Sequence, residues 1–299
     1  MQEKSCKEFL TTSLCVKTNN NIEIMKKVFI ILISIVIANL ATAQTTANEA
    51  IEGCVFGAMG NEKFEKFGYI NSHGEKMTCS FDDIAALLQK DVIGFYGLGD
   101  KYNTELKVKA YKQTDDYKDT YETMMEEYDY FTQNKGYVLF NLRYNSNYDV
   151  AKRCFFFKIG FDDLYRYSQP NYLCFEKGLA LTYPSAYLSR TKQETSLATN
   201  GTFNYNILKT TTIPEETALK IENEMEKPNC NARLLIIFKL SKAANEKKVV
   251  AGYYVNQTFI IGKSIAAYLV NVKTGEVYAN MSSIFNQTAN RKTTIQRKR

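Results

Sequence analysis

Residues 234–238 read LLIIF, and residues 265–278 read IAAYLVNVKTGEVY. The first run is apolar without alternation, which is typical of a central strand buried on both faces of a sheet. The second run continues a long apolar strand that begins near residue 259 and ends at a turn, Lys273–Glu276, where Gly275 is free to take positive φ. The two residues after the turn return as a short strand. These segments predict antiparallel strands in the C-terminal third.

The segment before the apolar run predicts a helix. Pro214 suits a first helical position, because the N–H that proline lacks has no partner there. Glu215 and Glu216 then favour the positive end of the helix dipole. We expect this helix to run to about Glu226 and to stop at Pro228.

Two further helices are indicated in the N-terminal half. Ser80 can cap a helix whose first turn carries two aspartates and whose apolar side includes Ile84, Leu87 and Leu88. Between Tyr117 and Phe131, aromatic residues and methionines recur at spacings of three and four with charges between them, which is the pattern of an amphipathic helix.

Strand patterns alternate with these helices. Apolar and charged residues alternate over 105–110, which favours a half-buried strand. Tyr137–Tyr144 and Cys154–Phe161 are predicted as two strands joined by a polar turn at Asn145–Asn147. Residues 94–100 are glycine-rich and are interpreted as a bend beside a strand. With no Pro/Ser-rich linker in the body, we predict a single α+β domain over residues 44–290, mainly antiparallel sheet with two to four helices packed on it.

The N-terminus carries an export pattern. Met25–Lys27 is a short basic start, residues 28–40 are almost wholly apolar, and Ala41–Ala43 has small residues at both ends. This is the organisation of a secretory signal peptide over residues 25–43, and the apolar run is shorter than the roughly 20 residues of a membrane span. We expect cleavage before Gln44; the alternative is an uncleaved N-terminal anchor.

Residues 1–24 are polar and precede this signal, so we interpret them as an extension from an upstream start. The glutamine after Ala43 and the many Asn, Lys, Ile and Tyr residues resemble exported proteins of the Bacteroidota. The order of helix, buried strand and YLVNVKTGEVY resembles exported bacterial families of unknown function. The signal peptide predicts a periplasmic or secreted protein without a membrane span after cleavage, and the resemblance implies no activity.

Charge argues against a nucleic-acid partner. The chain has a formal net charge of +6, but residues 44–290 hold 28 Lys and Arg against 29 Asp and Glu. A nucleic-acid-binding protein needs a basic surface to neutralise phosphates, and the body has no basic surplus. Residues 291–299 carry five basic and no acidic residues and are expected to form a disordered tail.

Seven cysteines are present, of which Cys6 and Cys15 precede Met25. Export makes one or two disulfides plausible, and proximity in sequence suggests Cys54–Cys79 and Cys154–Cys174. The alternative is that several of these cysteines are buried thiols. No C-x-x-C motif occurs and His73 is the sole histidine, so neither a metal site nor another cofactor is predicted.

Short motifs do not add an activity. His73 lies in a polar turn, which favours a solvated histidine over a catalytic one. Gly262–Ser264 resembles the end of a phosphate-binding loop, but Gln257 stands where that loop needs its first glycine, and the segment has the pattern of a strand. The run Asn145–Asp149 starts like a calcium loop but lacks its later glycine and glutamate.

Paired acids supply the enzymatic alternative. Adjacent carboxylates occur at residues 82–83, 115–116, 126–127 and 162–163. Two carboxylates held across a cleft can hydrolyse a glycosidic bond, so a periplasmic glycosidase-like hydrolase remains the second hypothesis. Two acids facing each other in a concave pocket would favour this enzyme over a binding protein.

Aromatic residues supply the leading hypothesis. A polar stretch concentrates tyrosines whose contact area and polar tip suit a binding surface. The candidate binding residues are Tyr165, Arg166, Tyr167, Tyr172, Tyr183 and Tyr187. The alternative is that these tyrosines pack along sheet edges and at the bases of loops. We therefore predict an exported, non-enzymatic protein that binds an envelope protein or a small ligand.

Overall fold

Strand β11 (Ala232–Val250) lies in the middle of the larger of two sheets in the computed structural model, which describes residues 46–59, 66–70, 75–142, 146–161, 163–194, 202–250 and 252–286. Residues 234–238 of this strand are at most 3% exposed. Alternate residues of the run pack into the main core and into a separate apolar cluster, as expected for the two faces of one strand. The prediction of a strand buried on both faces is confirmed.

Four predictions fall on residues that the structure does not describe. These are the extension over residues 1–24, the signal peptide over residues 25–43, the environment of His73, and the basic tail over residues 291–299.

The larger sheet is mixed and follows the order β3-β2-β1-β4-β11-β12-β8-β7, with β13 also paired to β12. The pairs β1–β4 and β12–β8 are parallel, and the other pairings among the described strands are antiparallel. The strands are β1 (Cys54–Met59), β2 (Lys66–Ile70), β3 (Lys76–Ser80), β4 (Lys135–Asn141), β7 (Tyr172–Cys174), β8 (Leu179–Thr182), β12 (Tyr253–Asn271) and β13 (Val277–Asn280).

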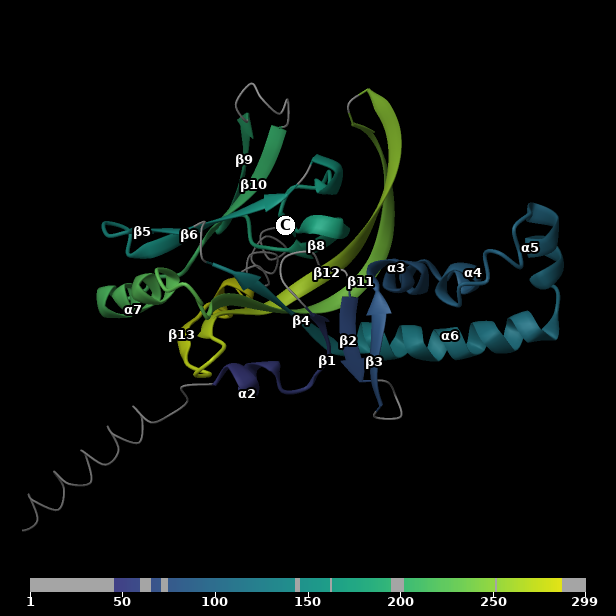
Figure 1. The fold of residues 1–299 in the computed structure, drawn as a ribbon, viewed down its shortest axis with the longest axis horizontal. Helices are drawn as coiled ribbons and strands as arrows, with labels where there is room; N and C mark the ends of the chain where they lie inside the picture. Colours follow the sequence, from purple (N-terminus) through teal and green to yellow (C-terminus); the bar gives the residue numbers. More distant parts are fainter. Residues whose placement is uncertain are drawn as a thin grey trace, which may run out of the picture. The chain divides into compact units, whose positions relative to one another are not determined.

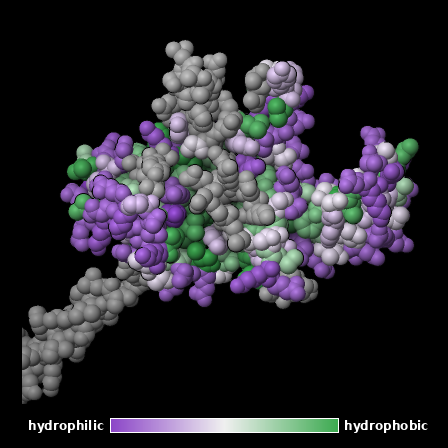
Figure 2. All heavy atoms as spheres, in the orientation of Figure 1, coloured by the Kyte–Doolittle hydropathy of each residue, from purple (hydrophilic) through white to green (hydrophobic). Residues whose placement is uncertain are grey.

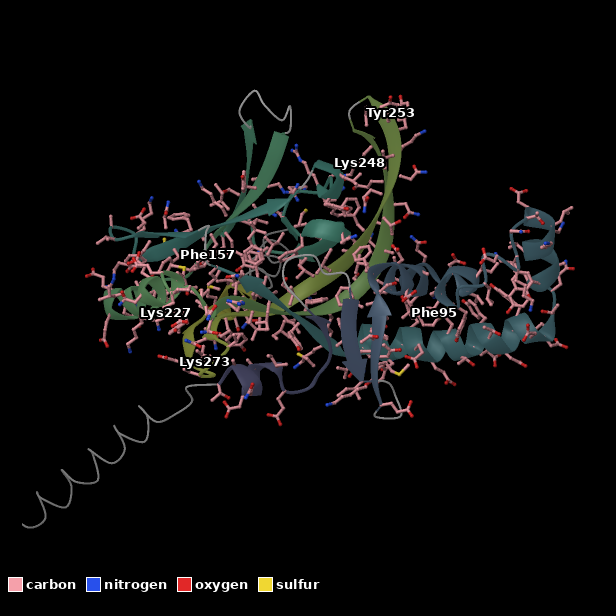
Figure 3. All side chains as sticks on the ribbon, in the orientation of Figure 1. Phe95, Phe157, Lys227, Lys248, Tyr253 and Lys273 are labelled. Carbon is pink, nitrogen blue, oxygen red and sulfur yellow. The ribbon has the colours of Figure 1, made fainter. Side chains whose placement is uncertain are left out.

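Strands β11 and β12 form a long antiparallel hairpin that curves away from the rest of the sheet (Figure 1). Tyr253 lies at its tip and is 76% exposed (Figure 3). The turn after β12 is confirmed, since Gly275 has φ of 74° and β13 pairs back with β12.

The smaller sheet has the order β5-β6-β10-β9 and is entirely antiparallel. Its strands are β5 (Ser146–Asp149), β6 (Cys154–Phe161), β9 (Leu188–Glu194) and β10 (Thr202–Lys209). Phe155, Phe157 and Ile159 of β6 pack into the same main core as the larger sheet. The prediction of a turn at Asn145–Asn147 is therefore wrong in part, because Ser146 and Asn147 begin strand β5. The two strands that this turn was expected to join, β4 and β6, belong to different sheets.

The described residues hold seven α-helices, more than the two to four expected. Six of them are α2 (Ala47–Ile51), α3 (Phe81–Gln89), α4 (Val92–Phe95), α5 (Glu105–Tyr111), α6 (Asp115–Gln133) and α7 (Glu215–Met225), and a further short helix covers residues 283–286. The predicted α3, α6 and α7 are confirmed; Ser80 caps α3 through a reciprocal hydrogen-bond pair with Asp83. Helices α2 and α4 are too short to leave a periodic signal.

Two local predictions were wrong. Residues 105–110 form helix α5 rather than a strand, because the Thr104 side chain accepts the Lys107 N–H and starts a helix in which Leu106 stays 80% exposed. Six residues of alternation cannot distinguish the strand period from the helix period when leucine, lysine and alanine all favour helix. Residues 94–95 are the end of helix α4 and residues 96–100 follow it, so this segment is not a bend beside a strand.

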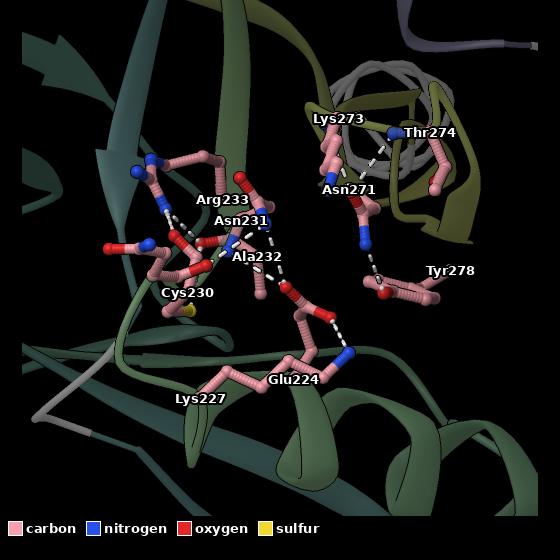
Figure 4. Close-up of polar contacts among 11 residues, drawn as sticks. Glu224, Lys227, Cys230, Asn231, Ala232, Arg233, Asn271, Lys273, Thr274 and Tyr278 are labelled. Atoms are coloured by element: carbon pink, nitrogen blue, oxygen red, sulfur yellow. Dashed lines mark hydrogen bonds and ion pairs between the residues drawn. The ribbon is translucent and has the colours of Figure 1, made fainter.

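Helix α7 is joined to the sheet by a polar network around Glu224, which is 5% exposed (Figure 4). One carboxylate oxygen of Glu224 accepts from the backbone N–H and side-chain amide of Asn231 at 3.0 Å each, and the other accepts from Lys227 at 2.6 Å. The hydrogen bond from Lys227, supported by those from Asn231, lowers the pKa of Glu224. In Figure 2, hydrophilic side chains dominate the surface over α7 and β5, as expected for an amphipathic helix.

Candidate functional site: the strand-break cavity

One edge of β12 is covered by two different strands that do not meet. Strand β8 pairs with Ile260–Lys263, and β13 pairs from Tyr268 onward. Just past the last paired residue of β8, the Ser264 backbone N–H donates to the Thr182 hydroxyl oxygen at 3.1 Å. This N–H is therefore bonded to a side chain of β8 and not to a backbone carbonyl. Among the described strands, none pairs with this edge of β12 between the two contacts.

Two β-bulges lie at the same place. Ile237 of β11 pairs with Ala266 and Phe238 pairs with Ser264, so Ile265 is an extra residue in β12. Leu240 pairs with Gly262 and Lys242 pairs with Ile261, so Ser241 is an extra residue in β11. Bulges bend a strand and redirect side chains, and they are common beside functional sites.

A cavity of about 550 Å³ lies at this break, which is within the range of small-ligand sites. We call it the strand-break cavity. It is lined by residues from β7, β8 and the following loop, by both bulged strands, and by Phe285. The lining residues are Asn171, Tyr172, Thr182, Tyr183, Pro184, Ser185, Ser241, residues 261–264 and Phe285.

Two buried hydroxyl groups of this lining have no hydrogen-bond partner among the described residues. They belong to Tyr183, which is 2% exposed, and Ser264, which is 3% exposed. A buried polar group without a partner costs about 1–3 kcal/mol. Burial also raises the pKa of Tyr183, so its hydroxyl stays protonated and able to donate.

The cavity combines polar groups with apolar walls. Phe285 packs edge-to-face on Tyr183, with 5.2 Å between the ring centroids. Lys263 is exposed at the rim of the cavity. Among the described lining residues, Lys263 carries the charge, and no carboxylate is present. Gly262 is required by packing, because a Cβ there would lie 2.7 Å from Leu181 Cδ2.

Of the six predicted binding residues, Tyr172 and Tyr183 meet at the strand-break cavity. Tyr165 instead lines a different cavity, of about 470 Å³, with Asp82 and Lys177. Tyr187 is half-buried ahead of β9, and Arg166 is exposed.

Tyr167 is a packing residue rather than part of an open binding surface. It is 7% exposed, and its ring packs against Tyr172 and Phe259 with centroid distances of 5.0 and 5.1 Å. Arg190 fixes the backbone of this segment by donating to the carbonyls of Tyr167, Gln169 and Tyr172 at 2.8–3.0 Å. The aromatic stretch therefore divides between packing and the wall of one cavity.

Among the described residues, the paired acids do not converge in the two cavities above, and Asp162 of the pair at residues 162–163 lies outside the described residues. Asp82 and Asp83 lie in the first turn of α3, where Asp83 caps the helix. Asp115 and Asp116 lie in the first turn of α6. The cavity beside Tyr165 is lined by one acid, Asp82. Within the described part of the chain, no three His, Cys, Asp or Glu side chains are grouped so as to hold a metal ion.

Neither predicted disulfide is formed, and the five cysteines of the described chain are free thiols. Cys54 lies on β1 and Cys79 on β3, with β2 between them, so two inter-strand spacings of about 4.8 Å separate their strands. Cys154 and Cys174 lie in different sheets, and Cys154 is the first residue of β6. The Cys174 carbonyl accepts a hydrogen bond from Asn206 of β10. Asn206 is paired with Ile159 of β6, which is five residues farther along β6 than Cys154. Both separations exceed the reach of a disulfide.

Sequence reasoning missed Thr182, Ser241, Lys263 and Ser264 as cavity residues. The prediction that Gly262–Ser264 belongs to a strand is confirmed, because these residues lie in β12. The overlooked signal is the position of these three residues, which interrupt an otherwise apolar strand. A glycine and polar residues within a buried strand often mark a bulge or a ligand approach.

Comparison with protein-family models, curated proteins and solved structures gives no match for this chain. In the part of the chain that the structure describes, no helix has both the length and the apolar character needed to cross a membrane.

Proposed function

We propose that this protein is an exported, non-enzymatic binding protein that takes a small organic molecule into the strand-break cavity. The observation that carries the proposal is the pair of buried, unpartnered hydroxyls of Tyr183 and Ser264 in the lining of one cavity. The export pattern at Met25–Ala43 supports a site of action outside the cytoplasm.

Each unpaired, buried hydroxyl costs about 1–3 kcal/mol in the folded protein. A ligand that forms hydrogen bonds with both hydroxyls recovers that free energy on binding. Tyr172, Ile261 and Phe285 add apolar contact area around the polar groups. Apolar walls with a few convergent polar groups are the usual composition of a small-molecule site.

Binding is favoured over hydrolysis by the chemistry of the lining. A glycosidase-like mechanism needs two carboxylates across the bound sugar, whereas the described lining of this cavity offers hydroxyls, one amide and one ammonium group. These groups can orient a ligand by hydrogen bonds, and none of them supplies the acid–base pair of the hydrolase hypothesis.

The test is ligand-observed NMR of the purified protein against a library of water-soluble metabolites and fragments. Ser185 is exposed at the rim, so Ser185→Trp should fill the opening without disturbing the core. Ser189→Trp, at an exposed position on β9 outside the cavity lining, is the matched control.

We expect compounds that bind the wild-type protein and Ser189→Trp and that lose binding in Ser185→Trp, with unchanged circular dichroism in all three. A library in which no compound binds, or hits that bind Ser185→Trp as well as the wild type, would contradict the proposal.

A further inference from the structure

We infer that the ligand of the strand-break cavity carries an oxyanion, a carboxylate or a phosphate, bound by Lys263 and by the hydroxyls of the lining. This inference rests on the proposed function and adds the chemical class of the ligand. Its first support is the charge of the site: Lys263 brings a positive charge, and the described lining residues bring no negative one.

The second support is a like-charge pair. Lys239 of β11 stands directly opposite Lys263 of β12 in the antiparallel register. Directly opposite residues project from the same face of a sheet with their Cβ atoms about 5 Å apart, and like charges in that position are destabilising. Lys239 donates to the Gln133 carbonyl at 2.7 Å, and neither lysine forms an ion pair with an acid of the described chain. A bound anion would relieve this repulsion.

The third support is the direction of the available hydrogen bonds. The Tyr183 and Ser264 hydroxyls are unpartnered. The Thr182 oxygen already accepts from the Ser264 backbone, which leaves its own O–H to be donated. The lining therefore offers O–H donors as well as the ammonium group of Lys263, and an oxyanion can accept from either kind of group. A cationic ligand would meet Lys263 without a carboxylate to balance its charge.

The experiment compares three probes of similar size: benzoate, phenyl phosphate and the neutral benzamide. Their dissociation constants are measured by NMR titration against wild-type protein, Lys263→Gln, and Lys273→Gln. Lys273 is an exposed lysine in the turn after β12, outside the described cavity lining, and serves as the charge-matched control (Figure 3).

We expect at least one of the two anions to bind about tenfold or more tightly than benzamide, because hydrogen bonds to charged groups are stronger than neutral ones. Lys263→Gln should weaken the binding of that anion by about tenfold and leave the affinity for benzamide unchanged, and Lys273→Gln should change neither affinity. The tighter anion then identifies carboxylate or phosphate as the group recognised.

Equal affinity for benzamide and both anions, or no loss in Lys263→Gln, would overturn the assignment of an oxyanion while leaving a binding site in place. If none of the three probes binds although library compounds occupy the cavity, the oxyanion assignment is also wrong. If neither the probes nor the library bind, the proposed function itself fails.

Discussion

Replacing Tyr183 with phenylalanine should stabilise the protein in the absence of ligand, although most substitutions in a core destabilise. The change removes the hydroxyl and keeps the ring, so the edge-to-face contact with Phe285 is retained. That hydroxyl has no partner among the described residues, and its burial in the folded state costs about 1–3 kcal/mol that the unfolded chain does not incur. We expect the free energy of unfolding to rise by about 1–2 kcal/mol.

For a chain of this size the gain corresponds to a rise in Tm of roughly 2–6 °C, measurable by calorimetry or by thermal unfolding followed by circular dichroism. Tyr148→Phe is the matched control, because the Tyr148 hydroxyl donates to the Ile213 carbonyl at 2.8 Å. The control should lose about 1 kcal/mol. A loss of stability in Tyr183→Phe comparable to that in Tyr148→Phe would show that the Tyr183 hydroxyl is satisfied in the folded protein and would refute the reasoning behind the cavity.

Three further predictions concern the fold. Gly136→Ala should lower the free energy of unfolding by about 1–3 kcal/mol in urea titrations, because a Cβ there would overlap the buried ring of Phe56, whereas Gly99→Ala, with open space around it, should stay near wild type. Glu224→Gln should lose about 2 kcal/mol at pH 7. The pKa of this glutamate is lowered in the folded state. Its contribution to the free energy of unfolding is therefore present above the unfolded-state pKa of about 4.3 and is lost as the pH falls through the folded-state pKa. A stability difference between Glu224→Gln and wild type that does not shrink in acid would contradict this. Burial raises the pKa of Cys54 to about 11 and of Cys79 to about 12, so both should react slowly with iodoacetamide at pH 8 in folded protein and quickly after denaturation, and a linked peptide in non-reducing mapping would contradict free thiols.

The sequence determined the elements whose signal is local and long enough to be unambiguous. The apolar run at residues 234–238 specified a buried central strand, because no polar residue is available to face water on either side. The Ser80 cap and the spacing between Tyr117 and Phe131 specified helices α3 and α6, because caps and a 3.6-residue period act within a few turns. The α+β class followed from these elements.

Only the tertiary structure decided which elements meet. The separation of β4 from β6 into two sheets, the parallel pairing of β8 with β12 and the gap before β13 join segments far apart in sequence, and no local pattern encodes such pairings. The bulges at Ser241 and Ile265 exist only relative to a partner strand, so the register of β11 against β12 defines them. Tyr183 and Ser264 are about eighty residues apart, and their hydroxyls became a candidate site only because the end of β8 leaves both buried beside one cavity.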